Sequence, residues 1–324
     1  MKSGKISALA LIIVLAAGIM SACNVSKPYP AAKDITVIIP KGAGGGTDIS
    51  TRGALQYLGK YIDNAKFVCV NKPDGGGVTG MMNTALAKPD GYTLGAVTVE
   101  LAMFPHQDKC KVTYQDFAPI FAQIAAPAAL IVPSDSPYNT LDEFVAYCKE
   151  NPRKVQMGNS GMGAIWHIAA MSFENEFNVE LKHVPYPNGT ADIIAALVGG
   201  HIDATLADPS GVLGQYKAGK IKILSVMAAE RSKIYPDVPT FAELGHNMTI
   251  RAWACIVAPK ETPAEILSVL RNAAAKLVED PDYQAYMIKQ GIDPVNIVGE
   301  TCYEMMKADH KMFGEMLPKI EGLN

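Results

Sequence analysis

The chain has 324 residues, of which 49% are hydrophobic and 19% charged, and its formal net charge is −3. Residues 1–22 contain two lysines and no acidic residue, so their removal moves the charge from −3 to −5. This mild acidity argues against a nucleic-acid partner, which would require a basic stripe. The length suits two domains better than one simple core.

The chain begins with the pattern of a secretory signal peptide. Lys2 and Lys5 precede an apolar run over residues 6–19, and small residues follow it. The run is shorter than the about 20 residues that a membrane-spanning helix needs. We expect residues 1–22 to be absent from the mature protein.

The residues around this expected cut site predict a lipid anchor. Met-Ser-Ala-Cys at positions 20–23 resembles a lipobox, although Met20 stands where most lipoboxes have Leu. A lipidated Cys23 would hold the protein at the outer side of the cell membrane, with residues 23–33 as a tether. An ordinary signal peptide with a chance cysteine is the alternative.

The remaining cysteines and the histidines predict no metal site and no cofactor. Their spacing matches neither a disulfide framework nor a zinc site. One cysteine pair could be bridged outside the cell, but the spacing does not select it. The five cysteines after Cys23 are Cys69, Cys110, Cys148, Cys255 and Cys302.

Strands and helices alternate in the first third of the chain. Buried strands are predicted at residues 35–39, 66–71 and 93–97, and helices at 48–61 and 78–87. This βαβαβ order predicts a mostly parallel sheet that is wrapped by helices.

The same alternation resumes after the apolar run at residues 129–132. A helix over 141–150 is expected to begin with a capping box made by Thr140 and Glu143. This second α/β set closes with a strand at 221–226. Between them we expect strand 155–158, helix 163–176, strand 180–184, helix 191–198 and strand 204–207.

The last part of the chain has too few strands for a third sheet. Residues 251–258 form a strand, and residues 262–265 predict a second capping box with Pro263 at the first helical position. Helices follow at 282–289 and 300–317, and we expect them to pack on the first α/β set.

The predicted chain therefore passes twice between two lobes, near residues 122–132 and 249–257. Lobe 1 comprises residues 34–130 and 252–324, and lobe 2 comprises residues 131–251. Two crossings form a hinge, and the cleft between two lobes is where small ligands usually bind.

A glycine-rich loop joins the first strand to the first helix. Its glycines, including Gly45 and Gly46, can present backbone N–H groups, and the helix start adds unpaired donors that favour an anion. Thr47 adds a hydroxyl, and Asp48 could cap the helix or accept a hydrogen bond from a ligand. A purely structural turn is the alternative, because the loop matches neither a P-loop nor a dinucleotide fingerprint.

A matching loop, Gly-Asn-Ser-Gly-Met-Gly at 158–163, follows a strand of lobe 2. Ser160 and the nearby N–H groups could hold a carboxylate, and two such helix starts would converge on one cleft. A nucleophilic Ser160 is the enzymatic alternative. However, Met162 replaces the second glycine of G-x-S-x-G, and His167 lies two helical turns further on, so we expect no catalysis.

Short motifs recur along the chain in a specific order and spacing. They are Pro40 with Gly44–Asp48, Asn71–Pro73 with Gly75–Gly77, Lys88–Leu94, Gly158–Gly163, Val184–Tyr186, Gly199–Asp203 and Pro236–Thr240. In these motifs the chain resembles the Bug family, the TctC-like receptors of tripartite tricarboxylate transporters. The resemblance covers essentially the whole mature chain.

This resemblance implies a type II periplasmic-binding-protein fold, in which two α/β lobes are joined by a two-segment hinge. It implies an extracytoplasmic receptor that captures a small carboxylate-bearing solute and delivers it to a membrane permease. We expect a monomer with no enzymatic activity. A ligand-sensing receptor for a signalling partner is the alternative.

The resemblance also implies ligand contacts from both lobes. The lobe 1 positions are Gly45, Gly46, Thr47, Asp48, Gly77 and Thr79, and the lobe 2 positions are Ser160, Gly161, Gly163, Tyr186 and Asp208. Asp208 could equally cap a helix that starts at Pro209, and Tyr186 could equally pack under a loop.

Two positions depart from the family pattern. Lys41 stands where an aromatic residue is common; it could supply the only cation near the cleft and favour a dianion, or extend into solvent. Pro187 stands where a basic residue is frequent, so known ligands of the family do not transfer to this chain. Trp253 could shield the cleft or simply pack.

Overall fold

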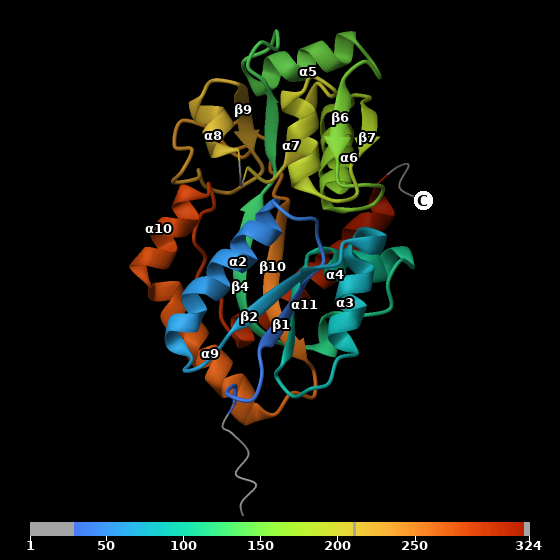
Figure 1. Ribbon diagram of the computed structural model, residues 1–324. Helices are drawn as coiled ribbons and strands as arrows, with labels where there is room; N and C mark the ends of the chain where they lie inside the picture. Colours follow the sequence, from blue (N-terminus) through green and yellow to red (C-terminus); the bar gives the residue numbers. More distant parts are fainter. Residues whose placement is uncertain (1–28, 210–211, 321–324) are drawn as a thin grey trace, which may run out of the picture.

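The structure is a computed structural model that describes residues 29–209 and 212–320. This part of the chain forms two lobes, one above the other in Figure 1, and each is built around a five-stranded sheet. The expected signal peptide, Cys23 and most of the expected tether lie outside the described residues.

The first sheet is mixed, with strand order β2-β1-β3-β10-β4. Strands β1 (Ile35–Ile39), β2 (Phe67–Asn71) and β3 (Thr93–Thr98) pair in parallel, whereas β10 (Arg251–Pro259) is antiparallel to both β3 and β4 (Phe117–Pro127). The prediction of a mostly parallel sheet is confirmed for β1, β2 and β3, and among the described strands of this sheet β10 alone has the opposite direction, because it returns from the second lobe and inserts between β3 and β4. Strand β4 was missed because it is almost continuously buried and lacks alternation.

The second sheet repeats this plan, with strand order β7-β6-β8-β5-β9. Strands β6 (Gln156–Asn159), β7 (Lys182–Pro185) and β8 (Ala204–Ala207) pair in parallel, and β5 (Ala129–Pro133) is antiparallel to β8 and β9 (Ile221–Val226). Strands β1 and β6 thus hold equivalent central places in the two parallel trios. The glycine-rich loop that follows each one lies at the carboxyl end of its sheet, where ligands bind in α/β folds.

Helices cover both sheets (Figure 1). In the first lobe they are α2 (Gly46–Leu58), α3 (Val78–Ala85), α4 (Glu100–Met103), α9 (Ala264–Glu279), α10 (Pro281–Lys289) and α11 (Glu300–Met316). In the second they are α5 (Leu141–Glu150), α6 (Ile165–Phe177), α7 (Thr190–Val198) and α8 (Leu213–Lys217). The C-terminal helices contact α2, α4 and β4, which confirms that they pack on the first lobe.

The two predicted capping boxes differ from what the structure shows. At α5, Thr140 accepts from Glu143 N–H as expected, but the Glu143 carboxylate accepts from Asn139 N–H instead of closing back on Thr140. At α9 the box is wrong, because the Thr262 hydroxyl donates to the Pro259 carbonyl and Pro263 occupies the N-cap position.

A buried indole anchors the returning strand β10 to α11. Trp253 Nε1 donates to Asp309 Oδ2 at 2.7 Å, and Arg251 Nη2 lies 3.3 Å from Asp309 Oδ1. Trp253 is 1% exposed and also borders the space between the lobes. Packing and shielding are therefore both roles of this residue.

The five cysteines of the described chain have free thiols, and four of them are buried. The Sγ atoms of Cys255 and Cys302 lie 2.9 Å apart, between β10 and α11. Burial raises the pKa of the Cys255 thiol well above its ordinary value.

Replacing Asp309 by alanine is expected to lower the free energy of unfolding by about 1–3 kcal/mol, since the buried Trp253 N–H loses its acceptor. Urea denaturation measures this change. Glu304→Ala, an exposed position of the same helix, is the control and should stay within about 0.5 kcal/mol of the parent. Equal effects of the two substitutions would contradict the anchoring role.

Candidate ligand-binding site

A cavity of about 40 Å³ lies between the two lobes, enough for a few water molecules. Gly45, Gly46 and Thr47 line it from the first lobe, and Ser160 and Asp208 line it from the second. These positions, predicted from two separate parts of the sequence, meet at one place.

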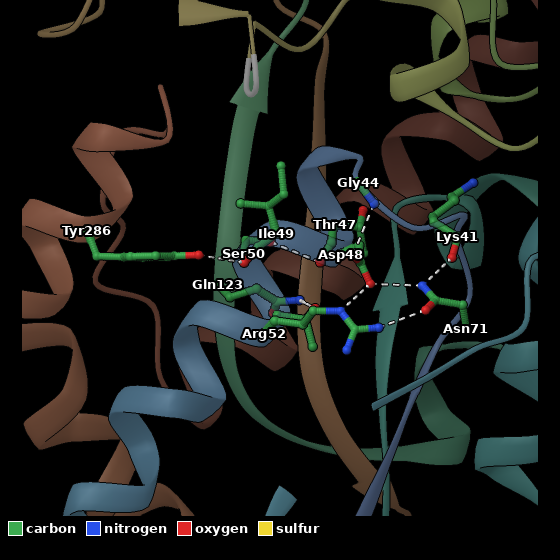
Figure 2. Close-up of polar contacts among 11 residues, drawn as sticks. Lys41, Gly44, Thr47, Asp48, Ile49, Ser50, Arg52, Asn71, Gln123 and Tyr286 are labelled. Atoms are coloured by element: carbon green, nitrogen blue, oxygen red, sulfur yellow. Dashed lines mark hydrogen bonds and ion pairs between the residues drawn. The ribbon is translucent and has the colours of Figure 1, made fainter. Parts of the chain in front are cut away.

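The first glycine loop is held in shape by Asp48 (Figure 2). Its Oδ2 accepts from Gly44 N–H at 3.0 Å, and its Oδ1 accepts from Arg52 Nε and Asn71 Nδ2, both at 2.9 Å. Asn71 Nδ2 also donates to the Lys41 carbonyl. Asp48 is 4% exposed and does not line the cavity, so it fixes the loop against α2 and β2.

The start of α2 offers donors to the cavity. Its N-cap, Gly45, has no side chain that could accept from the helix. The N–H groups of Gly46, Thr47 and Asp48 have no acceptor among the described residues. Such a helix start favours a negatively charged group.

The start of α6 also borders the cavity, with Ala164 as N-cap. Ser160 Oγ accepts from Trp166 N–H at 3.1 Å, which leaves the hydroxyl proton of Ser160 to be donated into the cavity. His167 N–H donates to the Ala164 carbonyl at 3.0 Å, so Ile165 N–H is the donor of this first turn that has no acceptor among the described residues. Both lobes therefore bring a helix start to one cavity.

A directed hydrogen-bond chain supports the second lobe's wall. Trp166 Nε1 donates to Thr190 Oγ1 at 3.1 Å, and Thr190 Oγ1 is 2.7 Å from Asp208 Oδ2. Because an indole can only donate, the Thr190 hydroxyl must donate to Asp208. The next described helix, α8, begins at Leu213.

The other predicted positions do not line the cavity; besides Asp48 they are Gly77, Thr79, Gly161, Gly163 and Tyr186. Thr79 is exposed on α3, and Tyr186 is half-buried against the core. The N–H groups of Gly161 and Gly163 are already bonded, to Asn159 Oδ1 and His167 Nδ1.

Glycine is required at two of these positions for close packing. A Cβ on Gly77, which has φ +106°, would lie 2.7 Å from the Pro40 carbonyl oxygen. A Cβ on Gly163, which has φ +71°, would meet the side chains of Gln107 and Lys109 from the first lobe. The second position thus lies where the two lobes touch.

Two charged residues at the cavity form an ion pair that was not predicted from the sequence. Lys41 Nζ lies 2.9 Å from Glu100 Oε1, and the side chains are 13% and 1% exposed. The Glu100 Oε2 atom accepts from Thr98 Oγ1 at 2.5 Å. Lys41 therefore does not extend into solvent. One sequence feature could have singled out Glu100 as a functional residue: it is the only charged residue between Gly91 and Phe104.

Among the described residues, the site shows no activated nucleophile. His167 Nδ1 is occupied by Gly163 N–H, and burial, with the neighbouring His183, lowers the pKa of His167 to about 4. Ser160 is bonded to a backbone N–H and not to an imidazole. Within residues 29–209 and 212–320, no group of three or more His, Cys, Asp or Glu side chains could hold a metal ion.

No helix in the described part of the chain is both long enough and apolar enough to cross a membrane.

Two lobes that close over a cavity lined with hydrogen-bond donors define a solute-binding protein. Residues 56–321 match the family model of the tripartite tricarboxylate transporter family receptor (TctC), and the chain belongs to this family. Its relatives of known structure are solute-binding proteins, which confirms the expected fold and the expectation that the chain is not an enzyme.

Individual relatives agree with this assignment. The chain is 32% identical over 263 residues to a UPF0065 protein of Cupriavidus necator, which covers 81% of this chain and 80% of that protein. The structure of a TctC solute-binding protein from Polaromonas, solved without ligand, is 33% identical, with a TM-score of 0.70 over 90% of this chain and 99% of that one. The structure of the periplasmic binding protein BugD is 27% identical in sequence, with a TM-score of 0.82 over 89% of this chain and 97% of that one.

Substituting alanine for Asp48 should destabilise the protein by about 1–3 kcal/mol, because three donors lose a buried acceptor. Chemical denaturation tests this, with Asp63→Ala in an exposed turn as the matched control. Ligand affinity should fall as well, since the loop that presents the α2 donors is released. A variant as stable as the control would show that Asp48 does not hold the loop.

Proposed function

We propose that this protein is an extracytoplasmic receptor that captures a small carboxylate-bearing solute between its lobes and delivers it to a tripartite tricarboxylate-type membrane transporter. One observation carries the proposal: the starts of α2 and α6, one from each lobe, border the same cavity together with the Ser160 hydroxyl. Backbone N–H groups and the Ser160 hydroxyl would then form charge-assisted hydrogen bonds to the carboxylate.

The lobes already touch in this structure. Gly42 N–H donates to the Asn188 carbonyl at 3.2 Å, Gln107 Nε2 donates to the Gly163 carbonyl at 2.9 Å, and Lys109 Nζ donates to the Met162 carbonyl at 2.6 Å. A ligand that bonds to both lobes binds this closed arrangement better than an open one, so it shifts the population toward closure. The closed surface is then available for recognition by the membrane partner.

The expected lipid anchor fits this role. A signal peptide followed by a lipidated Cys23 would place a monomeric receptor at the outer face of the cell membrane, next to its transporter. Labelling with a radioactive fatty acid tests the anchor, and Cys23→Ser should abolish the label.

The mature, detergent-solubilised protein should be stabilised by mono- or dicarboxylates, by amino acids, or by both. At a ligand concentration 100 times the dissociation constant, the expected gain is about 2.7 kcal/mol. A thermal-shift screen with amide-blocked versions of each compound measures it, and mass spectrometry checks that the ligand is recovered unchanged. A panel without any carboxylate response, or a chemically altered ligand, would contradict the proposal.

Ser160→Ala removes the hydroxyl that donates into the cavity. The dissociation constant of the identified ligand should rise at least tenfold, since a hydrogen bond to a charged group contributes about 1.5–3 kcal/mol. Isothermal titration calorimetry measures this, and Ser268→Ala, on an exposed face of α9, is the control. Unchanged affinity in Ser160→Ala would exclude Ser160 from the ligand site.

A further inference from the structure

The ion pair between Lys41 and Glu100 lies on the wall of the ligand cavity. Lys41 comes from the loop after β1, and Glu100 begins α4 directly after β3. Their charged atoms are 2.9 Å apart, and both residues, with Thr98, border the cavity. Lys41 Nζ also donates to the Gly76 carbonyl at 3.2 Å.

This pairing changes the electrostatic character of the cavity. Among the residues that the structure describes, the charged side chains that line it are Lys41, Glu100 and Asp208. Since the Lys41 ammonium is already matched by Glu100, it gives no uncompensated positive charge for a ligand. The anion-favouring groups are instead the starts of α2 and α6.

A ligand with two carboxylates fits this arrangement poorly. Its second carboxylate would have to draw Lys41 away from Glu100, and the 1% exposed Glu100 would then be buried without its counter-charge, which is strongly unfavourable. If Lys41 stayed in place, the second carboxylate would face Glu100 as a like charge in a space with little water.

Glu100 can still accept from a ligand. Its two oxygens together offer about four lone-pair sites, of which Lys41 and Thr98 occupy one each. A cationic donor beside Glu100 would occupy a remaining lone-pair site of this carboxylate.

We infer that the natural ligand is a small aminocarboxylate, whose carboxylate binds the helix starts and Ser160 and whose ammonium group faces Glu100. This inference rests on the proposed function, because it assumes that the cavity holds the carboxylate. It names the substrate class, and it assigns Lys41 and Glu100 as specificity-determining residues.

The first experiment compares probes of equal chain length on the mature, detergent-solubilised protein by isothermal titration calorimetry. One set is 4-aminobutyrate, butyrate and succinate, and a second is alanine, propionate and malonate. In at least one set the aminocarboxylate should bind tenfold or more tighter than the matching dicarboxylate. If both dicarboxylates bind tighter, the inference is overturned while the proposed function stands; if no probe binds, both fail.

The second experiment frees Lys41 by Glu100→Gln, which keeps the size of the side chain. The preference should reverse: affinity for the dicarboxylate should rise at least tenfold, affinity for the aminocarboxylate should fall at least tenfold, and the monocarboxylate should change little. Glu304→Gln on the exposed face of α11 is the control. Equal loss for all three probes would show that the pair only supports the fold. The wild-type probe order decides the inference even if Glu100→Gln does not fold.

Discussion

Unpaired backbone donors at two helix starts are the constraint on which this molecule depends. The first N–H groups of a helix have no partner within the helix, and most helices satisfy them with a side-chain cap. Here the N-caps are Gly45 and Ala164, which have no side-chain acceptor, and at α6 Ser160 Oγ accepts from Trp166 N–H and leaves Ile165 N–H unpaired among the described residues. Because these starts face an enclosed space between the lobes, an acceptor from outside the chain is the natural partner, and a carboxylate fits it best.

Each lobe contains the same strand–loop–helix arrangement. Each sheet has a parallel trio whose central strand leads through a glycine-rich loop into a helix, β1 into α2 and β6 into α6. The strands β4 and β10 then join the two sheets, so the loops face each other across the hinge (Figure 1). A ligand held by both loops is therefore sensitive to how far the lobes are open.

Features that depend on the order of neighbouring segments along the chain could be predicted from the sequence. The positions of the two glycine loops predicted Gly45, Thr47 and Ser160 at one cavity, because each loop follows a strand and precedes a helix. Contacts between distant segments were not predictable in this way. Glu100 meets Lys41 only because β1 and β3 are neighbours in the sheet, and Asp48 holds its loop through Asn71 of β2 and does not line the cavity.

Strand β4 and the direction of β10 were not predictable for a related reason. The segment that forms β4 is uniformly apolar, so its period does not distinguish a strand from a buried crossing. The direction of β10 follows from the return of the chain out of the second lobe, which no short window of sequence contains.

The most direct test is a crystal structure of the protein with its ligand bound. We expect a carboxylate oxygen within hydrogen-bond distance of Ser160 Oγ, with the other oxygen at the first N–H groups of α2 and the lobes closed around the ligand. A ligand carboxylate bound to Lys41 with Glu100 displaced, or a ligand bound outside this cavity, would contradict it.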